Sequence, residues 1–414
     1  MRRVRIGIIG AGPLTEWAVL PALSGPDAVA PPDSGAWWSR RPVADSQIRY
    51  QAPAQPEVVA LADADEERAR RVAAASRIRA VYGDWRLMLR EAPLDAVICA
   101  SAADIAAAVA TCDAARAVAL WIDGPPAPSA AGVLQLSRML QGRARGVWCA
   151  RPLRQAAAHR AARRLMENSE IGEVSALSLR WSTPLHLPIK ADASTARTDA
   201  TSHLASSYAA CDLLLAFAAT SAPGSAVPLR VMASEHHGAT SVWLQFANGV
   251  SATALFAGAD NWNAPLPRLE ICGSEGRYIV CEAGRRTWLH QPREPARLLE
   301  PPGMGVHLST ANVAGLAEDL KEFLAACVAN EAVAPDALAT GSTQGGEILL
   351  GAARALQVIE AAGESLATGR CIEIESLRVA TSGGVAPAPL QQRTSDETAT
   401  ASATPQTMTL TLQL

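Results

Sequence analysis

The sequence predicts an α/β protein in which a doubly wound parallel sheet precedes an α+β domain with a mostly antiparallel sheet. In residues 1–148, short apolar runs alternate with helical segments, a rhythm typical of parallel sheets with helices on both faces. In residues 149–380, short strands are separated by turn signals such as Asn248-Gly249, which favour antiparallel neighbours. Residues 381–414 are rich in Thr, Ser, Ala and Pro, and we expect them to be disordered.

A glycine turn follows the first predicted strand and opens a helix. Residues 5–23 read RIGIIGAGPLTEWAVLPAL. Gly10 lets the chain leave the strand sharply, and Gly12 lets its backbone come close to a ligand. Pro13 suits the first turn of the helix, whose positive end favours a phosphate. We therefore expect a dinucleotide-binding (Rossmann) site at Gly10, Gly12, Pro13 and Leu14, although a Gly-rich turn without a ligand is the alternative.

The fingerprint departs from its usual form at one position. It reads G-x-G-x-x-T, with Thr15 where the third glycine is expected. That glycine normally serves the packing of the helix on the strand and does not contact phosphate. The substitution is therefore compatible with a dinucleotide site.

Asp63 ends the second predicted strand, residues 58–63, where a carboxylate binds ribose hydroxyls in dinucleotide-binding folds. The usual spacing of about 20 residues from the glycines is exceeded, because an insertion over residues 24–56 intervenes. Ala64, and no arginine, follows Asp63, which favours NAD over NADP. A helix N-cap at Asp63 or Asp65 is the alternative interpretation.

The remaining elements follow from hydrophobic periodicity and turn residues. Further helices are predicted at 66–75, 85–90, 105–115, 129–140, 153–167, 311–329 and 345–362. Further strands are predicted at 80–82, 95–100, 118–123, 174–181, 228–233, 240–246, 251–258, 268–272, 277–281 and 286–290.

The amino-acid composition excludes several classes of binding partner. The formal net charge is -3, so no excess of positive charge draws the chain to nucleic acid or to an anionic membrane. No apolar run is long enough to span a bilayer, and the N-terminal run is too short for a signal peptide. The eight cysteines have no metal-ligand spacing. We expect a cytoplasmic protein with reduced thiols, no metal site and a small-molecule substrate.

Taken in order, several motifs resemble those of the Gfo/Idh/MocA oxidoreductases, the family of glucose-fructose oxidoreductase and inositol dehydrogenase. The matching segments are Gly10-Ala11-Gly12, Asp63, YGDWRLML at 82–89, SEIGEV at 169–174, RLEICGSEG at 268–276 and SLATGR at 365–370. The family segment that lies along the cofactor is matched poorly around Ser101. The resemblance implies NAD(P)-dependent hydride transfer with a sugar, polyol or related hydroxy compound. It also implies Ser101 and Asp123 at the cofactor, and a homo-oligomer.

The catalytic lysine of that family is missing. Its Glu-Lys-Pro triplet aligns with Asp123-Gly124-Pro125. In the family, the ammonium group polarises the substrate oxygen and helps to handle the proton. Lys190 and Lys321 are the only lysines, and Lys190, in a loop after the strand at 174–181, could in principle reach the site.

The family's D-x-G-x-H-x-x-D helix is also incomplete. One register places its last acid on Asp212 and puts Ala209 at the histidine position, whereas a rival register uses Asp199 and His203 but places Ser206 at the second acid. Asp212 and His203 are nine residues apart and would face opposite sides of a helix. Both are candidate catalytic residues, and a structural role is the alternative for each.

Three functional hypotheses follow. The first is an NAD-dependent oxidoreductase with rearranged acid/base groups. The second is a catalytically inactive dinucleotide-binding or ligand-sensing relative, since losing the base alone forfeits roughly 10²–10⁴ in rate. The third is a scaffold without a cofactor.

Overall fold

The computed structural model describes residues 2–24, 54–101, 103–112, 118–140, 146–181, 197–221, 227–257, 267–282, 286–299, 310–329 and 344–374. The chain divides into two units, residues 1–379 and 380–414. The predicted disorder of 381–414 and most of the predicted insertion at 24–56 lie outside the described residues.

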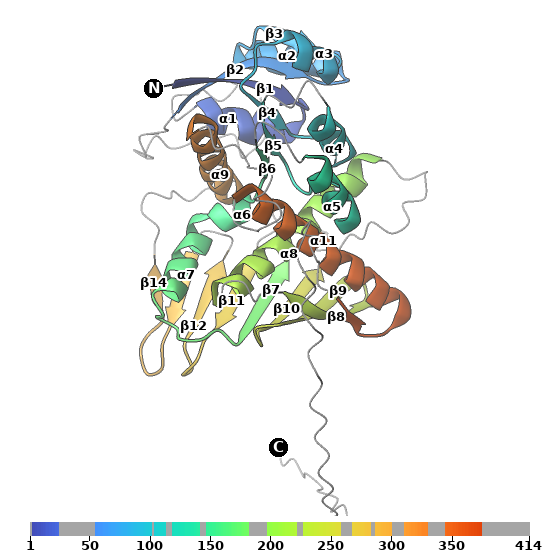
Figure 1. The fold of residues 1–414 in the computed structure, drawn as a ribbon. Coiled ribbons are helices and arrows are strands. Elements are labelled where there is room, and N and C mark those ends of the chain that lie inside the picture. Colours follow the sequence, from blue (N-terminus) through green and yellow to red (C-terminus); the bar gives the residue numbers. More distant parts are fainter. Residues whose placement is uncertain are drawn as a thin grey trace, which may run out of the picture. The chain divides into compact units, whose positions relative to one another are not determined.

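The first sheet is parallel and has the predicted doubly wound topology (Figure 1). Its order is β3-β2-β1-β4-β5-β6, so the direction of winding reverses between β1 and β4. Ligands of such sheets bind beyond the carboxyl ends of the strands at this switch point. The strands are β1 (Arg2–Ile9), β2 (Ala54–Ala62), β3 (Ala80–Tyr82), β4 (Ala96–Cys99), β5 (Ala119–Ile122) and β6 (Val147–Cys149).

Capped helices connect these strands. Asp65, Asp84 and Ser129 each accept a hydrogen bond from a backbone N–H of the helix that follows, as N-cap side chains do. All residues of β4 and β5 are buried, which is expected of a parallel sheet covered on both faces. The helical segments are η1 (Thr15–Val19), α1 (Leu20–Ser24), α2 (Glu66–Ser76), α3 (Trp85–Glu91), α4 (Ala103–Thr111) and α5 (Ala130–Met139).

Within the described ranges, the second sheet has nine strands, and only the pair β7 and β10 is parallel. Its order is β14-β13-β12-β11-β7-β10-β9-β8-β15. The strands are β7 (Ala176–Trp181), β8 (Pro228–His236), β9 (Ala239–Phe246), β10 (Ser251–Ala257), β11 (Arg268–Cys272), β12 (Tyr278–Glu282), β13 (Arg286–His290), β14 (Arg297–Leu299) and β15 (Ile372–Glu373).

Helices cover one face of this second sheet (Figure 1). Alternate residues of β7, namely Leu177, Leu179 and Trp181, are buried under that cover, while those between them are more exposed. The covering helices are α7 (Ala157–Glu167), α8 (Arg197–Ser221) and α11 (Gln344–Thr368). The predicted helix at 153–167 was wrong in one respect, because Ala156 is extended and separates α6 (Pro152–Gln155) from α7.

The late helices connect the two sheets. Helix α9 (Thr310–Ala329) packs against β1, β2 and α6, and α11 packs against both α5 and β8. Among the described residues, one buried hydrophobic core is therefore continuous from the first sheet to the second. Among the helices of the described residues, none is both long and apolar enough to cross a bilayer.

Candidate functional site

The glycine turn lies at the carboxyl end of β1, beside the switch point. Gly10 has a φ of +98°, and its N–H donates to the carbonyl of Ala62 (2.8 Å). A Cβ at Gly10 would stand 2.3 Å from the carbonyl oxygen of Ala100. The protein's own backbone therefore requires glycine at this position.

Gly12 is different, because nothing in the described part of the chain requires glycine there. A Cβ at Gly12 would meet no heavy atom within 4 Å, and its φ is not in the left-handed region. Pro13 and Leu14 begin the helix immediately after it, and the N–H of Glu16 donates to the Gly12 carbonyl. The space in front of Gly12 is therefore open at the N-terminal end of a helix, where anions bind.

Thr15 has a role that the sequence did not reveal. Its side chain is fully buried, and its hydroxyl donates to the carbonyl of Gly10 (2.6 Å). The residue that replaces the third glycine thus closes the turn with a hydrogen bond.

Asp63 lies directly after β2, as predicted, and faces the same turn. Its Oδ2 accepts a hydrogen bond from the N–H of Ala11 (2.6 Å), and its Oδ1 accepts one from Arg68 (2.7 Å). Burial works to raise the pKa of this carboxyl, but the bonds from Arg68, Ala11 and Asp65 outweigh it and hold the pKa below its usual value. The N-cap of α2 is Asp65, which confirms that alternative for one of the two acids.

Ser101 and Asp123 complete the carboxyl edge of the sheet. Ser101 follows β4 next to Gly10, since its Cβ lies 3.7 Å from the Cβ position of that glycine. Asp123 follows β5, and Gly124, at the position of the family's lysine, is buried with a φ of +75°. Burial, followed by the negative charge of Asp319, raises the pKa of Asp123 to about 6. The structure thus brings the seven predicted cofactor residues to one edge.

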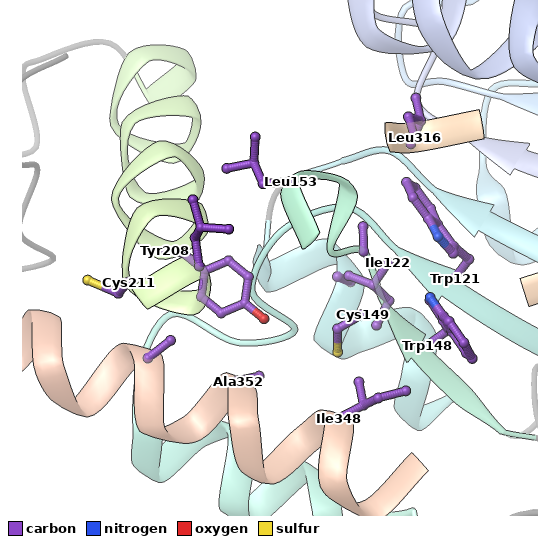
Figure 2. Close-up of a cluster of buried hydrophobic side chains, with 14 of the residues drawn as sticks. Trp121, Ile122, Trp148, Cys149, Leu153, Tyr208, Cys211, Leu316, Ile348 and Ala352 are labelled. Carbon is purple, nitrogen blue, oxygen red and sulfur yellow. The ribbon is translucent and has the colours of Figure 1, made fainter. Parts of the chain in front are cut away.

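Asp319 of α9 is a buried acid that sequence reasoning missed. Its Oδ2 accepts hydrogen bonds from the indole N–H groups of Trp121 (2.8 Å) and Trp148 (3.3 Å). Those two tryptophans are register partners on β5 and β6, and Figure 2 shows their rings side by side. Burial raises the pKa of Asp319 to about 6, and the indole donors and the nearby charge of Arg151 oppose that rise.

The two predicted catalytic residues lie on α8. Asp212 is buried, and its carboxylate accepts hydrogen bonds from both Nε (2.6 Å) and Nη2 of Arg154. The side chain of His203 lies outside the described side chains, and Lys190 lies outside the described residues. Asp212 is therefore held in a bidentate ion pair with α6, a geometry that favours a structural role for it.

Tyr208 is a second group that sequence reasoning did not single out. It precedes Ala209, the histidine position of one register, and its ring points from α8 toward the strand that carries Cys149 (Figure 2). Its buried hydroxyl has no hydrogen-bond partner among the described residues, and burial raises its pKa well above the usual value. A buried hydroxyl without a partner is uncommon, and an unseen water or ligand is one explanation of such a group.

The open face of the second sheet carries a shallow hollow of about 660 Å³. Outward-facing side chains line it, among them Arg180, Met232, Trp243, Arg268 and Glu270. This hollow belongs to the face opposite the covering helices and is separate from the glycine turn. Among the described residues, no group of three His, Cys, Asp or Glu side chains is placed to hold a metal ion.

Comparison with known proteins agrees with this architecture. No protein-family model and no curated protein sequence matches the chain. Solved structures do match over most of their length. A dehydrogenase from Chromobacterium violaceum is 17% identical with a TM-score of 0.65, over 89% of this chain and 97% of that one.

Two further structures carry ligands. Levoglucosan dehydrogenase, in complex with NADH and levoglucosan, is 15% identical with a TM-score of 0.68, over 91% of this chain and 100% of that one. An oxidoreductase from Agrobacterium radiobacter, in complex with NAD+, L-tartaric acid and magnesium, is 15% identical with a TM-score of 0.63. The match covers 90% of this chain and 98% of that one. The chain therefore has the two-sheet fold of these NAD-binding dehydrogenases, the fold that its resemblance to the Gfo/Idh/MocA oxidoreductases implied.

Proposed function

We propose that the protein is an NAD(P)-dependent oxidoreductase that acts on a sugar, polyol or related hydroxy compound. The observation that carries this proposal is the contrast between its two turn glycines. Gly10 is required by the protein's own backbone, whereas Gly12 faces open space and is explained by a phosphate that approaches the chain there. NAD is the expected cofactor, in keeping with the ligands of the matching structures.

The residues of this chain would bind and orient the cofactor and accept the proton of the substrate. Gly12 and the start of the helix at Pro13 would hold the pyrophosphate, and Ser101 and Asp123 would border the nicotinamide end of the site. A bound nicotinamide would supply the hydride chemistry. The proton of the substrate hydroxyl would then need a group other than the missing lysine, and Asp123 is nearest to that position in the sequence.

A catalytically inactive dinucleotide-binding or sensing protein is the second candidate. Two observations favour it. Gly124 offers no side chain where the family has its lysine, and the carboxylate of Asp212 is already committed to Arg154. Catalysis by Asp212 or His203 remains a prediction, and activity assays must decide between the two candidates.

Gly12→Ala tests the cofactor site. We expect this variant to unfold within about 1 kcal/mol of the parent, because alanine fits the free space and backbone. We expect the affinity for NADH, measured by quenching of tryptophan fluorescence, to weaken at least about tenfold, because the Cβ meets the pyrophosphate. Gly351→Ala, on α11, is the matched control and should not change binding. A parent protein that binds no dinucleotide at millimolar concentration would contradict both candidates.

Turnover separates the enzyme from the sensor. Incubation with NAD and a panel of polyols, or with NADH and keto-sugars, should change NADH absorbance if the protein is an oxidoreductase. Binding without turnover over the whole panel would favour the sensor. Asp123→Asn should reduce any turnover by roughly 10²–10⁴ if this carboxylate takes the proton.

We also propose that a second copy of the chain covers the open face of the second sheet. The apolar side chain of Met232 is 47% exposed there, next to its register partner Trp243. Arg268 and Glu270 lie farther across the same hollow, on β11, and their opposite charges suit a symmetric contact. Sedimentation equilibrium should then give at least twice the monomer mass of 43.3 kDa.

A further inference from the structure

The peptide group between Gly10 and Ala11 is held at both of its ends by side chains. Its carbonyl oxygen, which belongs to Gly10, accepts a hydrogen bond from the hydroxyl of Thr15 (2.6 Å). Its N–H, which belongs to Ala11, donates to Oδ2 of Asp63 (2.6 Å). Glycine has no Cβ and permits backbone rotations that other residues resist. The two bonds therefore fix a peptide group that its own glycine leaves free to rotate.

Thr15 is placed to hold this carbonyl at all times. Its side chain is fully buried, so the hydroxyl stays paired with the protein and does not turn to solvent. The helix is also unusual at this residue. The N–H of Leu20 donates to the carbonyl of Thr15, five residues earlier, and residues Thr15–Val19 form a π-helical turn, which is wider than an α-helical one. The wide turn thus begins at the residue whose side chain stands in place of the third glycine.

The groups that would meet a pyrophosphate follow directly after the fixed peptide. Gly12 has open space in front of it, and residues 13–24 are helical without a break. The N–H groups of Leu14 and Thr15 belong to the first turn of this helix, where backbone donors have no acceptor within the helix. The orientation of the peptide between Gly10 and Ala11 sets the direction in which the chain enters Gly12. Rotation of that peptide would therefore turn these donors away from one another.

From these contacts, and resting on the proposed dinucleotide site, we infer that Thr15 is a positioning residue whose hydroxyl holds the glycine turn in its pyrophosphate-binding shape before the cofactor arrives. Its side chain acts through Gly10, because the hydroxyl donates inward to that carbonyl. Without the hydroxyl, only part of the molecules keep the binding-competent turn, and the apparent affinity falls in proportion to that part. The departure from the glycine fingerprint at Thr15 then serves cofactor binding.

Three substitutions of Thr15 in the full chain test this inference by titration with NADH and with ADP-ribose, which carries the pyrophosphate but no nicotinamide. Thr15→Val keeps the shape and removes the hydroxyl, and it should weaken both ligands by about tenfold, as if about one molecule in ten kept the competent turn. Thr15→Ser keeps the hydroxyl and should stay within about threefold of the parent. Thr15→Gly restores the usual fingerprint but lacks the hydroxyl, and it should weaken both ligands by about tenfold as well. Hydrogen exchange at the amide of Ala11 should be faster in Thr15→Val without ligand.

Thr287→Val is the matched control. Thr287 lies on β13, is also fully buried, and its hydroxyl also donates to a backbone carbonyl, that of Ala158 (2.9 Å). This variant should leave both affinities unchanged, at a temperature where circular dichroism shows every variant folded. Thr15→Gly decides the matter if Thr15→Val does not fold.

The outcomes separate the inference from the function on which it rests. If the parent binds neither NADH nor ADP-ribose, the proposed function itself fails. If the parent binds them and Thr15→Val or Thr15→Gly binds them equally well, the hydroxyl does not position the turn, and the inference is wrong while the proposed function stands. The same holds if Thr15→Ser weakens binding as much as Thr15→Val does.

Discussion

Replacing Arg154 with methionine is expected to lower the free energy of unfolding by about 3–5 kcal/mol. The side chain of Asp212 is only 4% exposed and is bound by both Nε and Nη2 of Arg154, and Nη2 also donates to the Asp212 carbonyl (3.3 Å). The substitution would leave a buried carboxylate without its partner, and that costs far more than the pair contributes when intact. Urea unfolding at neutral pH measures the change.

Two controls accompany this variant. Arg160→Met removes a more exposed pair between α7 and Glu318 (3.2 Å), so a loss of no more than about 1 kcal/mol is expected. Arg154→Met combined with Asp212→Leu removes both charges and should recover part of the lost stability. A loss below about 1 kcal/mol in Arg154→Met alone would show that the pair does not hold α6 to α8.

Between pH 4 and pH 6, the buried carboxyl of Asp319 is expected to make the protein less stable as the pH rises. The pKa of this group is about 6 in the folded chain and has a reference value of 3.8, so the folded state binds the proton more tightly. Its contribution is fully present below the reference value and is lost as the pH rises through about 6. The shift corresponds to about 3 kcal/mol.

The difference between the parent and Asp319→Asn reports this effect together with its coupling to Asp123, whose pKa the charge of Asp319 raises. Unfolding free energies of both proteins are measured at several values between pH 4 and pH 8. Relative to Asp319→Asn, the parent should lose stability over that interval, because the amide does not ionise. Parallel curves for the two proteins would contradict the assignment. The variant Trp121→Phe removes one donor to the carboxylate, so its stability should fall more steeply with pH than that of the parent.

Much of the fold could be predicted because the residues that mark the ends of its helices and strands lie next to them in the sequence. The strands β3, β11 and β13 begin and end as predicted, since turn residues bound each of them. The strands β6, β14 and β15 have three residues or fewer and were missed, although β3, which also has three residues, was predicted. The split between α6 and α7 was also missed, because Ala156 is a good helix former and nothing in its residue type signals the non-helical backbone that it adopts.

The candidate site likewise has features that could be predicted from the sequence and features that could not. Gly10, Asp63 and Asp123 could be placed together because each follows a strand of one parallel sheet, a rule of topology. The partners of the acids could not be predicted. Asp212 lies 58 residues from Arg154, and no local pattern links positions so far apart.

The hydrogen bonds to Asp319 also bear on how the newly made chain matures at the ribosome. Trp148 emerges 171 residues before Asp319, and until then its indole and that of Trp121 lack their acceptor. The part of the chain that forms the first sheet is therefore synthesised first but completed late, when α9 packs against β1 and β2. A fragment that stops near residue 150 would expose this surface to chaperones and proteases.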